Sequence, residues 1–187
     1  MTQMTFNFCP QCGTKLVTQT VDFKQRQVCP HCRYIHWNDN VISVGGVVVK
    51  DGRYLLTQRA NNPGRGHWTN PGGFVEQTET LDKAIVREIQ EETGIITRPR
   101  GVFLIGERPL SSLHTIYVNF LLDYVSGQIN IQSNELMNAG FFSLAEMASM
   151  DVAGLTREII HRAQTTTNLL PFQEVNLNYT SQYRLYD

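Results

Sequence analysis

The sequence lacks a long apolar run, an excess of basic charge and any cysteine beyond residue 32. No 18 consecutive apolar residues occur in the 187-residue chain, so no transmembrane helix and no membrane partner are expected. The first eight residues do not form a secretory signal, which favours a cytoplasmic protein. Lys and Arg number 16 against 17 Asp and Glu, which argues against a general electrostatic attraction to nucleic acid or anionic membranes.

The length and composition of the chain suit one ordinary domain with a small additional module. Hydrophobic residues make up 41% of the chain, which is enough for a core. Because all four cysteines precede residue 33, a cysteine module is expected over residues 1–38 and a larger domain over residues 39–165. The polar tail, residues 166–187, shows no clear period and has no predicted structure.

Apolar patterning in the larger domain predicts an α+β fold with a mixed sheet. The expected strands cover residues 41–49, 53–58, 102–105 and 115–124, and Asp51-Gly52 forms a hairpin turn between the first two. Residues 140–142 are a short apolar piece. Helices are expected over residues 81–92 and 155–163. Thr80 is the expected N-cap and Gly94 the expected C-terminal glycine of the first, and Ser143-x-x-Glu146 is a capping box that starts another helix.

The four cysteines form two Cys-x-x-Cys pairs, Cys9 with Cys12 and Cys29 with Cys32, separated by sixteen residues. A tight turn at each pair brings two thiolates together, and two such pairs complete a tetrahedral sulfur site that suits Zn²⁺. A closed four-ligand site leaves no position for water, so the zinc is expected to be structural. The segment 15–28 between the pairs suits a hairpin. The alternatives are four unlinked thiols or a redox Cys-x-x-Cys.

The most informative stretch runs from residue 73 to residue 95 and reads GFVEQTETLDKAIVREIQEETGI. Glu88 and Glu92 are four residues apart, and Glu91 is three residues from Glu88, so helical geometry places them on one face. Clustered carboxylates repel one another unless a cation lies among them, and Mg²⁺ or Mn²⁺ in such a site can also bind phosphate oxygens. The alternative is a solvated acidic helix face.

This stretch resembles the Nudix box at every defining position, which are Gly73, Glu79, Arg87, Glu88, Glu91, Glu92 and Gly94. The preceding Gly66, Trp68, Pro71 and Gly72 also resemble that family. The resemblance implies an α/β/α sandwich that hydrolyses a nucleoside diphosphate linked to another moiety. It also implies that Glu88, Glu91 and Glu92 bind Mg²⁺ or Mn²⁺, and that Arg87 and Glu79 pair to hold loop and helix in place.

The sequence leaves the general base open between two residues. Glu92 is one candidate, as a ligand with base character. The other is Glu135, whose segment ELMNAGFF resembles an element that supplies a base outside the box in this family. The ordinary alternative for Glu135 is a residue of a surface loop.

A four-cysteine ribbon ahead of a Nudix domain resembles two groups. One is the NADH pyrophosphatases, some of which remove NAD caps from RNA, and the other hydrolyses FAD and ADP-ribose. The SQPWPFP-like string of the first group is absent after Ile95, so we expect cleavage of FAD or ADP-ribose with release of AMP. The alternatives are an NADH or NAD pyrophosphatase, an NAD-RNA decapping hydrolase, and a zinc ribbon that only binds nucleic acid.

Contacts to the substrate are expected from few residues. Trp37 can stack on a nucleobase or belong to a core, and Arg59 can contact phosphate. Aromatic residues between Tyr117 and Tyr124 can line a base pocket or the core, and the polar loop 106–114 is expected to select the second moiety. The expected partner is a small nucleotide, with capped RNA less expected, and the family resemblance favours a homodimer.

Overall fold

The computed structural model describes residues 6–37, 40–109, 114–131, 134–175 and 183–186. The chain divides into two compact units. The smaller unit comprises residues 1–41 with 107–115, and the larger comprises residues 42–106 with 116–187. Within the described residues, no helix combines the length and the apolar character that crossing a membrane requires.

The smaller unit contains a three-stranded sheet in the order β1 (Val17–Val21), β2 (Lys24–Val28) and β3 (Ile35–His36). β1 and β2 pair antiparallel across a turn at Asp22 and Phe23, which confirms the hairpin expected within residues 15–28. The buried hydrophobic cluster of this unit consists of Cys9, Leu16 and Cys29, with Tyr34 packed against it. So small a core contributes little to the stability of a fold, and small modules of this kind commonly gain stability from a bound metal.

The larger unit is built on a sheet in the order β10–β5–β4–β9–β8, with β6 paired to β5 and β7 paired to β4. The strands are β4 (Asn40–Lys50), β5 (Arg53–Arg59), β6 (Trp68–Thr69), β7 (Gly72–Phe74), β8 (Ile96–Pro109), β9 (His114–Ser126) and β10 (Leu136–Phe142). All four expected strands are present, each longer than predicted, and the short apolar piece 140–142 lies in β10. Asp51 and Gly52 both have positive φ in the β4–β5 turn, as the hairpin signal predicted.

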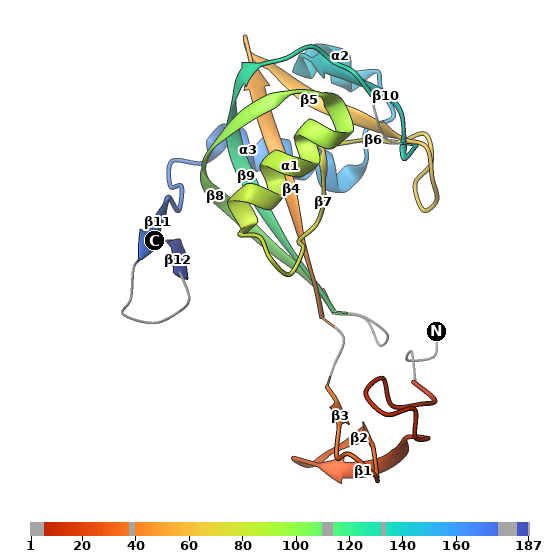
Figure 1. The fold of residues 1–187 in the computed structure, drawn as a ribbon. Helices are drawn as coiled ribbons and strands as arrows, with labels where there is room; N and C mark the ends of the chain where they lie inside the picture. Colours follow the sequence, from red (N-terminus) through yellow and green to blue (C-terminus); the bar gives the residue numbers. More distant parts are fainter. Residues whose placement is uncertain (1–5, 38–39, 110–113, 132–133, 176–182, 187) are drawn as a thin grey trace. The chain divides into compact units, whose positions relative to one another are not determined.

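Helices cover both faces of this sheet: α1 (Leu81–Thr93) packs on one face, and α2 (Leu144–Ala148) and α3 (Gly154–Thr165) pack on the other (Figure 1). Alternation along the strands divides the core between the two faces. Val44 and Val48 of β4 belong to the cluster with Ile85 and Ile89 of α1. Val47 belongs to the cluster with Met147, Ile159 and Ile160 of α2 and α3. The expected α/β/α sandwich is therefore confirmed.

The helix ends agree with the expected signals except at Thr80. Gly94 ends α1 with a φ of 73°, and its N–H donates to the Gln90 carbonyl at 2.8 Å. Ser143 and Glu146 form the predicted reciprocal capping box at α2. Thr80 occupies the N-cap position of α1, but its side chain makes no capping hydrogen bond. Its hydroxyl is buried without a partner among the described residues, so the predicted side-chain cap is wrong.

The tail contains an antiparallel hairpin of β11 (Phe172–Val175) and β12 (Tyr183–Tyr186), which the sequence did not predict. The Tyr186 ring packs edge-to-face against Phe120 of the sheet, with ring centroids 6.1 Å apart. Leu170 forms a β-bridge with Val102. The tail is therefore attached to the larger unit by packing that only the folded sheet provides.

Candidate active site and metal centre

The four cysteines of the smaller unit converge on one point. Their Sγ atoms all lie within 4.8 Å of one another, and three of the separations are 3.5 Å (Cys9–Cys32), 3.5 Å (Cys12–Cys29) and 3.6 Å (Cys12–Cys32). A tetrahedral zinc site with Zn–S bonds of about 2.3 Å requires sulfur separations of roughly 3.8 Å. The cluster therefore fits Zn²⁺, and it brings together all four residues that the sequence singled out.

The surroundings favour the thiolate form at two of the four sulfurs, Cys12 and Cys29. At Cys32 a backbone hydrogen bond from Tyr34 opposes burial and the neighbouring cysteine sulfurs, which together raise its pKa to about 12. Cys9, Cys12, Cys29 and Cys32 are free cysteines, and the Cys32 amide donates a hydrogen bond to the Cys29 sulfur at 3.4 Å. Hydrogen bonding by Thr14 lowers the pKa of Cys12 to about 5. A metal binds the thiolate rather than the thiol, so the lowered pKa values of Cys12 and Cys29 favour metal binding at these two sulfurs.

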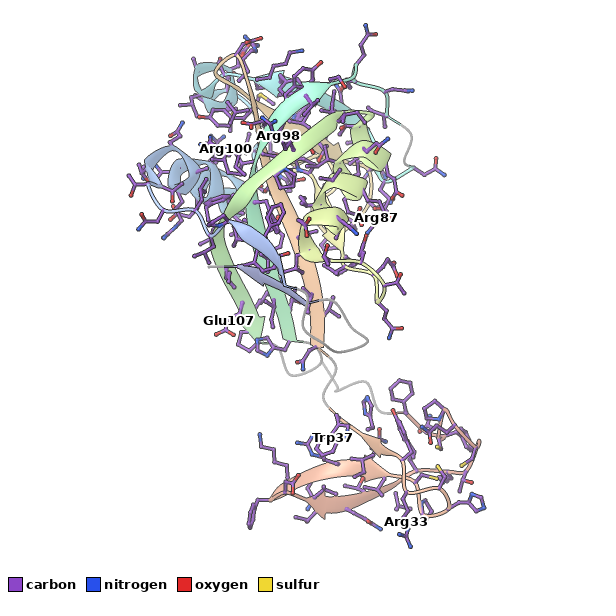
Figure 2. The ribbon with its side chains drawn as sticks, turned by 60° about the vertical axis from the view of Figure 1, so that its left-hand side comes forward. Arg33, Trp37, Arg87, Arg98, Arg100 and Glu107 are labelled. Carbon is purple, nitrogen blue, oxygen red and sulfur yellow. The ribbon has the colours of Figure 1, made fainter. Side chains whose placement is uncertain are left out.

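In the larger unit, Arg87 of α1 connects the loop before the helix to the helix itself (Figure 2). It donates to both oxygens of Glu79, at 3.0 Å from Nε and 2.6 Å from Nη2, and from Nη2 to the Phe74 carbonyl at 3.1 Å. The Arg87 guanidinium holds the pKa of Glu79 below its usual range. The pair that the family resemblance implied is therefore present, and its fork geometry fixes the loop that leads into α1.

We expect Arg87→Lys to lower the free energy of unfolding by about 1–3 kcal/mol, because an ammonium cannot reproduce the two parallel hydrogen bonds to Glu79. Urea denaturation of the wild type and the variant measures the loss. The matched control is Arg98→Lys, which alters an ion pair with Asp123 whose side chains are 74% and 41% exposed. The control change should stay below about 0.5 kcal/mol. Equal losses in the two variants would contradict a special role for Arg87.

Two carboxylates of α1, Glu88 and Glu92, face a cavity of about 680 Å³. The glycines that precede the helix make room for them. A Cβ at Gly73 would overlap the Glu88 carboxylate, and a Cβ at Gly72 would overlap the Val44 carbonyl. The Gly72 amide donates to Glu92 Oε2 at 3.3 Å. These glycines therefore let the β7 backbone pass close to the carboxylates.

Burial gives these two carboxylates unusual proton affinity. Burial, together with the charges of Glu88 and Glu135, raises the pKa of Glu92 to about 8, while the Gly72 amide and Arg59 oppose the shift. Burial also raises the pKa of Glu88, against the opposing effect of Arg87. Glu135 and Arg59 line the same cavity. The structure thus brings Glu88, Glu92, Glu135 and Arg59 together, and three carboxylates around one cavity suit a divalent cation.

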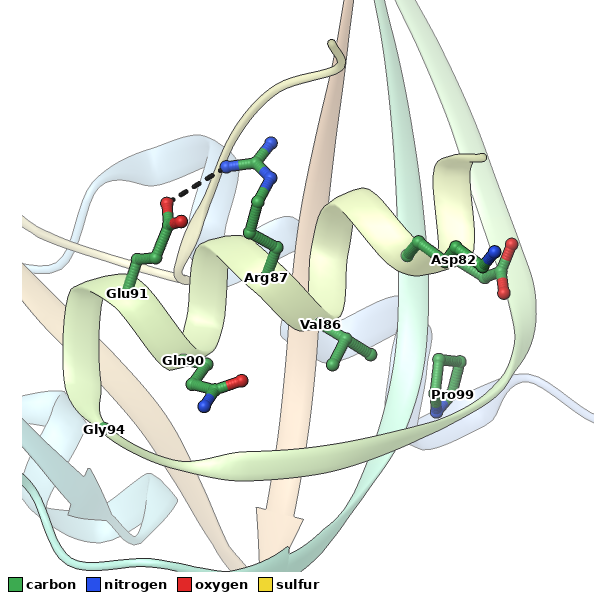
Figure 3. Close-up of a pocket in the computed structure, with 8 residues that line it drawn as sticks. Asp82, Val86, Arg87, Gln90, Glu91, Gly94 and Pro99 are labelled. Atoms are coloured by element: carbon green, nitrogen blue, oxygen red, sulfur yellow. Dashed lines mark hydrogen bonds and ion pairs between the residues drawn. The ribbon is translucent and has the colours of Figure 1, made fainter. Parts of the chain in front are cut away.

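Glu91 does not line this cavity, although it shares the Arg87 Nη1 donor with Glu88. Its side chain is 63% exposed and accepts a hydrogen bond from Arg87 Nη1 at 3.1 Å, and it lines a second cavity of about 630 Å³ between α1 and β8 (Figure 3). Among the described residues, only the four cysteines gather three or more Cys, His, Asp or Glu ligand atoms closely enough for one ion. The helical face expected to hold three glutamates therefore presents two of them to the first cavity.

The remaining predicted residues lie elsewhere. Trp37 is 52% exposed in the smaller unit, and the Arg26 guanidinium lies 4.5 Å from its ring centroid (Figure 2). Trp68 packs edge-to-face on Phe142, with ring centroids 4.9 Å apart. In the loop 106–114, residues 110–113 lie outside the described part of the chain.

Sequence reasoning missed the uncharged polar side of the first cavity. Asn70, Thr156 and Tyr117 line it, and all three are largely buried. The only signal was the aromatic content of residues 117–124, which could not be assigned to a pocket or to the core. No motif in the sequence had marked residues 70 and 156 as candidates for a site.

Two family models match the chain. Residues 39–163 match the NUDIX domain, and residues 7–38 match the family described as Nudix N-terminal, a zinc ribbon. Together the two matches cover the four cysteines and the whole carboxylate helix. The ranges meet at residues 38 and 39.

Similar proteins include an ADP-ribose pyrophosphatase from Methanocaldococcus jannaschii, 35% identical over 130 residues, or 68% of this chain and 74% of that protein. An NAD-capped RNA hydrolase NudC from Vibrio parahaemolyticus is 32% identical over 91% of this chain and 63% of its own length. This chain thus spans less than two thirds of that NudC. A crystal structure of a NUDIX hydrolase from Nitrosomonas europaea has a TM-score of 0.77 and 27% identity, covering 88% of this chain and 96% of that one.

Proposed function

Because the chain belongs to the Nudix hydrolase family and carries that family's N-terminal zinc ribbon, we propose that it cleaves the diphosphate of ADP-ribose or FAD and releases AMP. The observation that carries this proposal is the cavity in which Glu88 and Glu92 meet Glu135 and Arg59. An acidic wall with one arginine suits a diphosphate that enters together with a divalent cation.

Glu88 and Glu92 are the proposed ligands of Mg²⁺ or Mn²⁺, because their carboxylates are buried in the cavity and lie close enough to interact. Glu91 is the third proposed ligand, and it requires its side chain to leave Arg87. A bound cation would neutralise the diphosphate and make a bound water more acidic. Glu79, Arg87, Gly73 and Gly94 have the proposed role of holding the loop and helix in position.

The general base is proposed to be Glu92 or Glu135. Each lines the cavity, and burial together with the Glu135 charge raises the pKa of Glu92, so Glu92 has the proton affinity of a base. Arg59 is proposed to contact a phosphate from the end of β5, where its Nε donates to the Pro63 carbonyl at 3.0 Å. Trp37 remains a proposed stacking residue for a nucleobase.

The expected substrate preference is ADP-ribose or FAD over NADH. ADP-ribose is supported by the archaeal relative named ADP-ribose pyrophosphatase, and the sequence string of the NADH-cleaving group is absent. The test is kcat/KM for the three substrates under one Mg²⁺ concentration, with AMP as the measured product. We expect the NADH value to be the lowest. A tenfold higher value for NADH than for both others, about 1.4 kcal/mol, would contradict the preference.

A second candidate is hydrolysis of NAD-capped RNA. It is favoured by the NudC relative, whose match covers 91% of this chain and so extends into the zinc ribbon. RNA binding through phosphates would weaken steeply with added salt, whereas small-nucleotide turnover would change little. The affinity for NAD-capped RNA as a function of salt concentration therefore separates the two candidates.

We further propose that residues 1–38 form the ribbon, residues 39–165 the hydrolase domain and residues 166–187 a C-terminal tail. A cytoplasmic location is supported by the four free cysteines, which are typical of a reducing compartment. A homodimer is expected from the family resemblance. Light scattering during size-exclusion chromatography distinguishes it from a monomer.

A further inference from the structure

The cavity of the larger unit is lined by two chemically different sets of residues, a charged set called here its acidic side and an uncharged polar set called its uncharged side. Among the described residues, the charged ones that line it are Arg59, Glu76, Glu88, Glu92 and Glu135. The uncharged polar lining residues include Thr57, Thr69, Asn70, Tyr117 and Thr156. The proposed function gives the acidic side the role of binding the metal and the diphosphate. It gives the residues of the uncharged side no role.

A chain of hydrogen bonds orders this uncharged side. The Thr156 hydroxyl donates to Asn70 Oδ1 at 3.1 Å, and Asn70 Nδ2 donates to the Tyr117 hydroxyl oxygen at 2.9 Å. Thr156 is 3% exposed and Asn70 is 8% exposed, so little water competes for these bonds. Among the described residues Tyr117 accepts this hydrogen bond and donates none. Its hydroxyl hydrogen therefore remains available to an oxygen in the cavity.

The backbone beneath makes room for this hydroxyl. A Cβ at Gly45 would overlap the Tyr117 hydroxyl and would crowd Asn119 Oδ1. Asn119 lies two residues after Tyr117 on β9, so both side chains point to the same face of the sheet. Asn119 is fully buried, and neither its Oδ1 nor its Nδ2 has a partner among the described residues. A buried amide without hydrogen-bond partners lowers the stability of the fold. The Asn119 amide beside Tyr117 therefore has hydrogen-bonding capacity that the described residues do not use.

We propose that Tyr117, positioned by Asn70 and Thr156, donates a hydrogen bond to a pentose hydroxyl next to the scissile diphosphate. The inference rests on the proposed function and assigns a substrate contact to the uncharged residues of the same cavity. A neutral donor in a neutral wall suits a sugar hydroxyl, whereas a phosphate oxygen would favour a cationic partner such as Arg59. ADP-ribose, FAD and NADH all carry the adenosine ribose next to the diphosphate, so each offers such a hydroxyl.

The test is Tyr117→Phe, which removes one hydroxyl and retains the ring. We expect kcat/KM for ADP-ribose to fall by roughly tenfold, mainly through a higher KM. The matched control is Tyr54→Phe, which removes a hydroxyl whose partner is Gln164 Nε2 at 3.1 Å and which does not line this cavity. Tyr54→Phe should retain the wild-type KM. Unchanged kinetics in Tyr117→Phe would overturn the proposal.

Competition by product fragments identifies the group that Tyr117 contacts. In Tyr117→Phe, inhibition by AMP or by ribose 5-phosphate should weaken by the same factor as KM, while inhibition by inorganic pyrophosphate should not change. Equal weakening for pyrophosphate would assign the tyrosine to a phosphate and contradict the pentose contact. If the wild type does not cleave ADP-ribose, the proposed function fails. Calorimetric binding of AMP and of ribose 5-phosphate to the two proteins then tests the subsite alone.

Two substitutions of Thr156 test whether its hydroxyl positions Asn70 and, through it, Tyr117. Thr156→Val has nearly the same shape but cannot donate to Asn70, so KM should rise by roughly two- to threefold. Thr156→Ser retains the hydroxyl and should restore the wild-type KM. A purely structural role for Thr156 would lower stability in the valine variant without moving KM, and that result would remove Thr156 from the proposal.

Discussion

Replacing Glu92 with glutamine should reduce metal-dependent turnover by 10² or more, about 3 kcal/mol in the activation barrier. Glutamine has nearly the same shape, but it offers no negative charge to a cation and cannot accept a proton as a base. The measurement is kcat at saturating ADP-ribose and saturating Mg²⁺. Turnover equal to that of the wild type would remove the carboxylate helix from the mechanism.

In buffer without divalent metal, the same substitution should raise the stability of the protein. A variant that is more stable but inactive shows that its loss of turnover does not come from unfolding. Burial raises the pKa of Glu92 from its ordinary value of 4.5 to about 8. Between these values the unfolded chain loses the proton while the folded protein keeps it, so rising pH favours unfolding across this window. A shift of this size corresponds to a few kcal/mol at most, roughly 1.4 kcal/mol for each pKa unit.

Because glutamine does not ionise, the stability of Glu92→Gln does not fall with pH through this group. The Tm advantage of Glu92→Gln over the wild type should therefore widen between pH 5.5 and pH 8 in magnesium-free buffer. The control is Glu91→Gln on the same helix, whose side chain is 63% exposed in the wild type and should give no comparable gain. A Glu92→Gln variant that is less stable than the wild type at pH 8 would contradict a destabilising burial of the Glu92 charge.

Cys29→Ser should lose the bound zinc and unfold the smaller unit. The Cys29 sulfur lies 3.5 Å from that of Cys12 and receives the Cys32 amide hydrogen bond, so its loss opens the tetrahedral set. The free energy of zinc binding, on the order of 10 kcal/mol in small zinc modules, supplies most of the folding energy of such a unit. Elemental analysis should find about one zinc per wild-type chain and much less in the variant.

Thr14→Ala is the matched control for the zinc site, because it alters a hydrogen-bond partner of Cys12 and leaves all four sulfurs. It should retain zinc, while limited proteolysis should cut Cys29→Ser selectively within residues 1–41. Full zinc content in Cys29→Ser, or none in a wild type purified without chelators, would contradict a four-cysteine site.

Much of this site follows from local spacing. The two Cys-x-x-Cys pairs predicted the sulfur cluster, and the four-residue spacing of Glu88 and Glu92 predicted that both share a helix face. The contact between Arg87 and Glu91 also has the four-residue spacing of a helical ion pair, although it was not predicted from the sequence. Thr80 has the residue type and position of an N-cap, but not the hydrogen bond.

The uncharged side of the cavity could not be predicted because its members are distant in sequence. Asn70 and Tyr117 are 47 residues apart, and Asn70 and Thr156 are 86 apart. Only the folded sheet and the helix α3 bring them together, and none carries a local motif. The same holds for the tail, whose hairpin depends on a surface formed by residues far earlier in the chain.

The most direct test of metal-dependent diphosphate cleavage is product formation from ADP-ribose with and without Mg²⁺, using protein freed of divalent metal other than the ribbon zinc. We expect equal amounts of AMP and ribose 5-phosphate with Mg²⁺ and negligible amounts of either without it, together with loss of product in Glu92→Gln. Turnover without divalent metal, or no AMP with Mg²⁺ or Mn²⁺ from any ADP-linked substrate, would contradict the assignment of this cavity as a metal-dependent diphosphate-cleaving site.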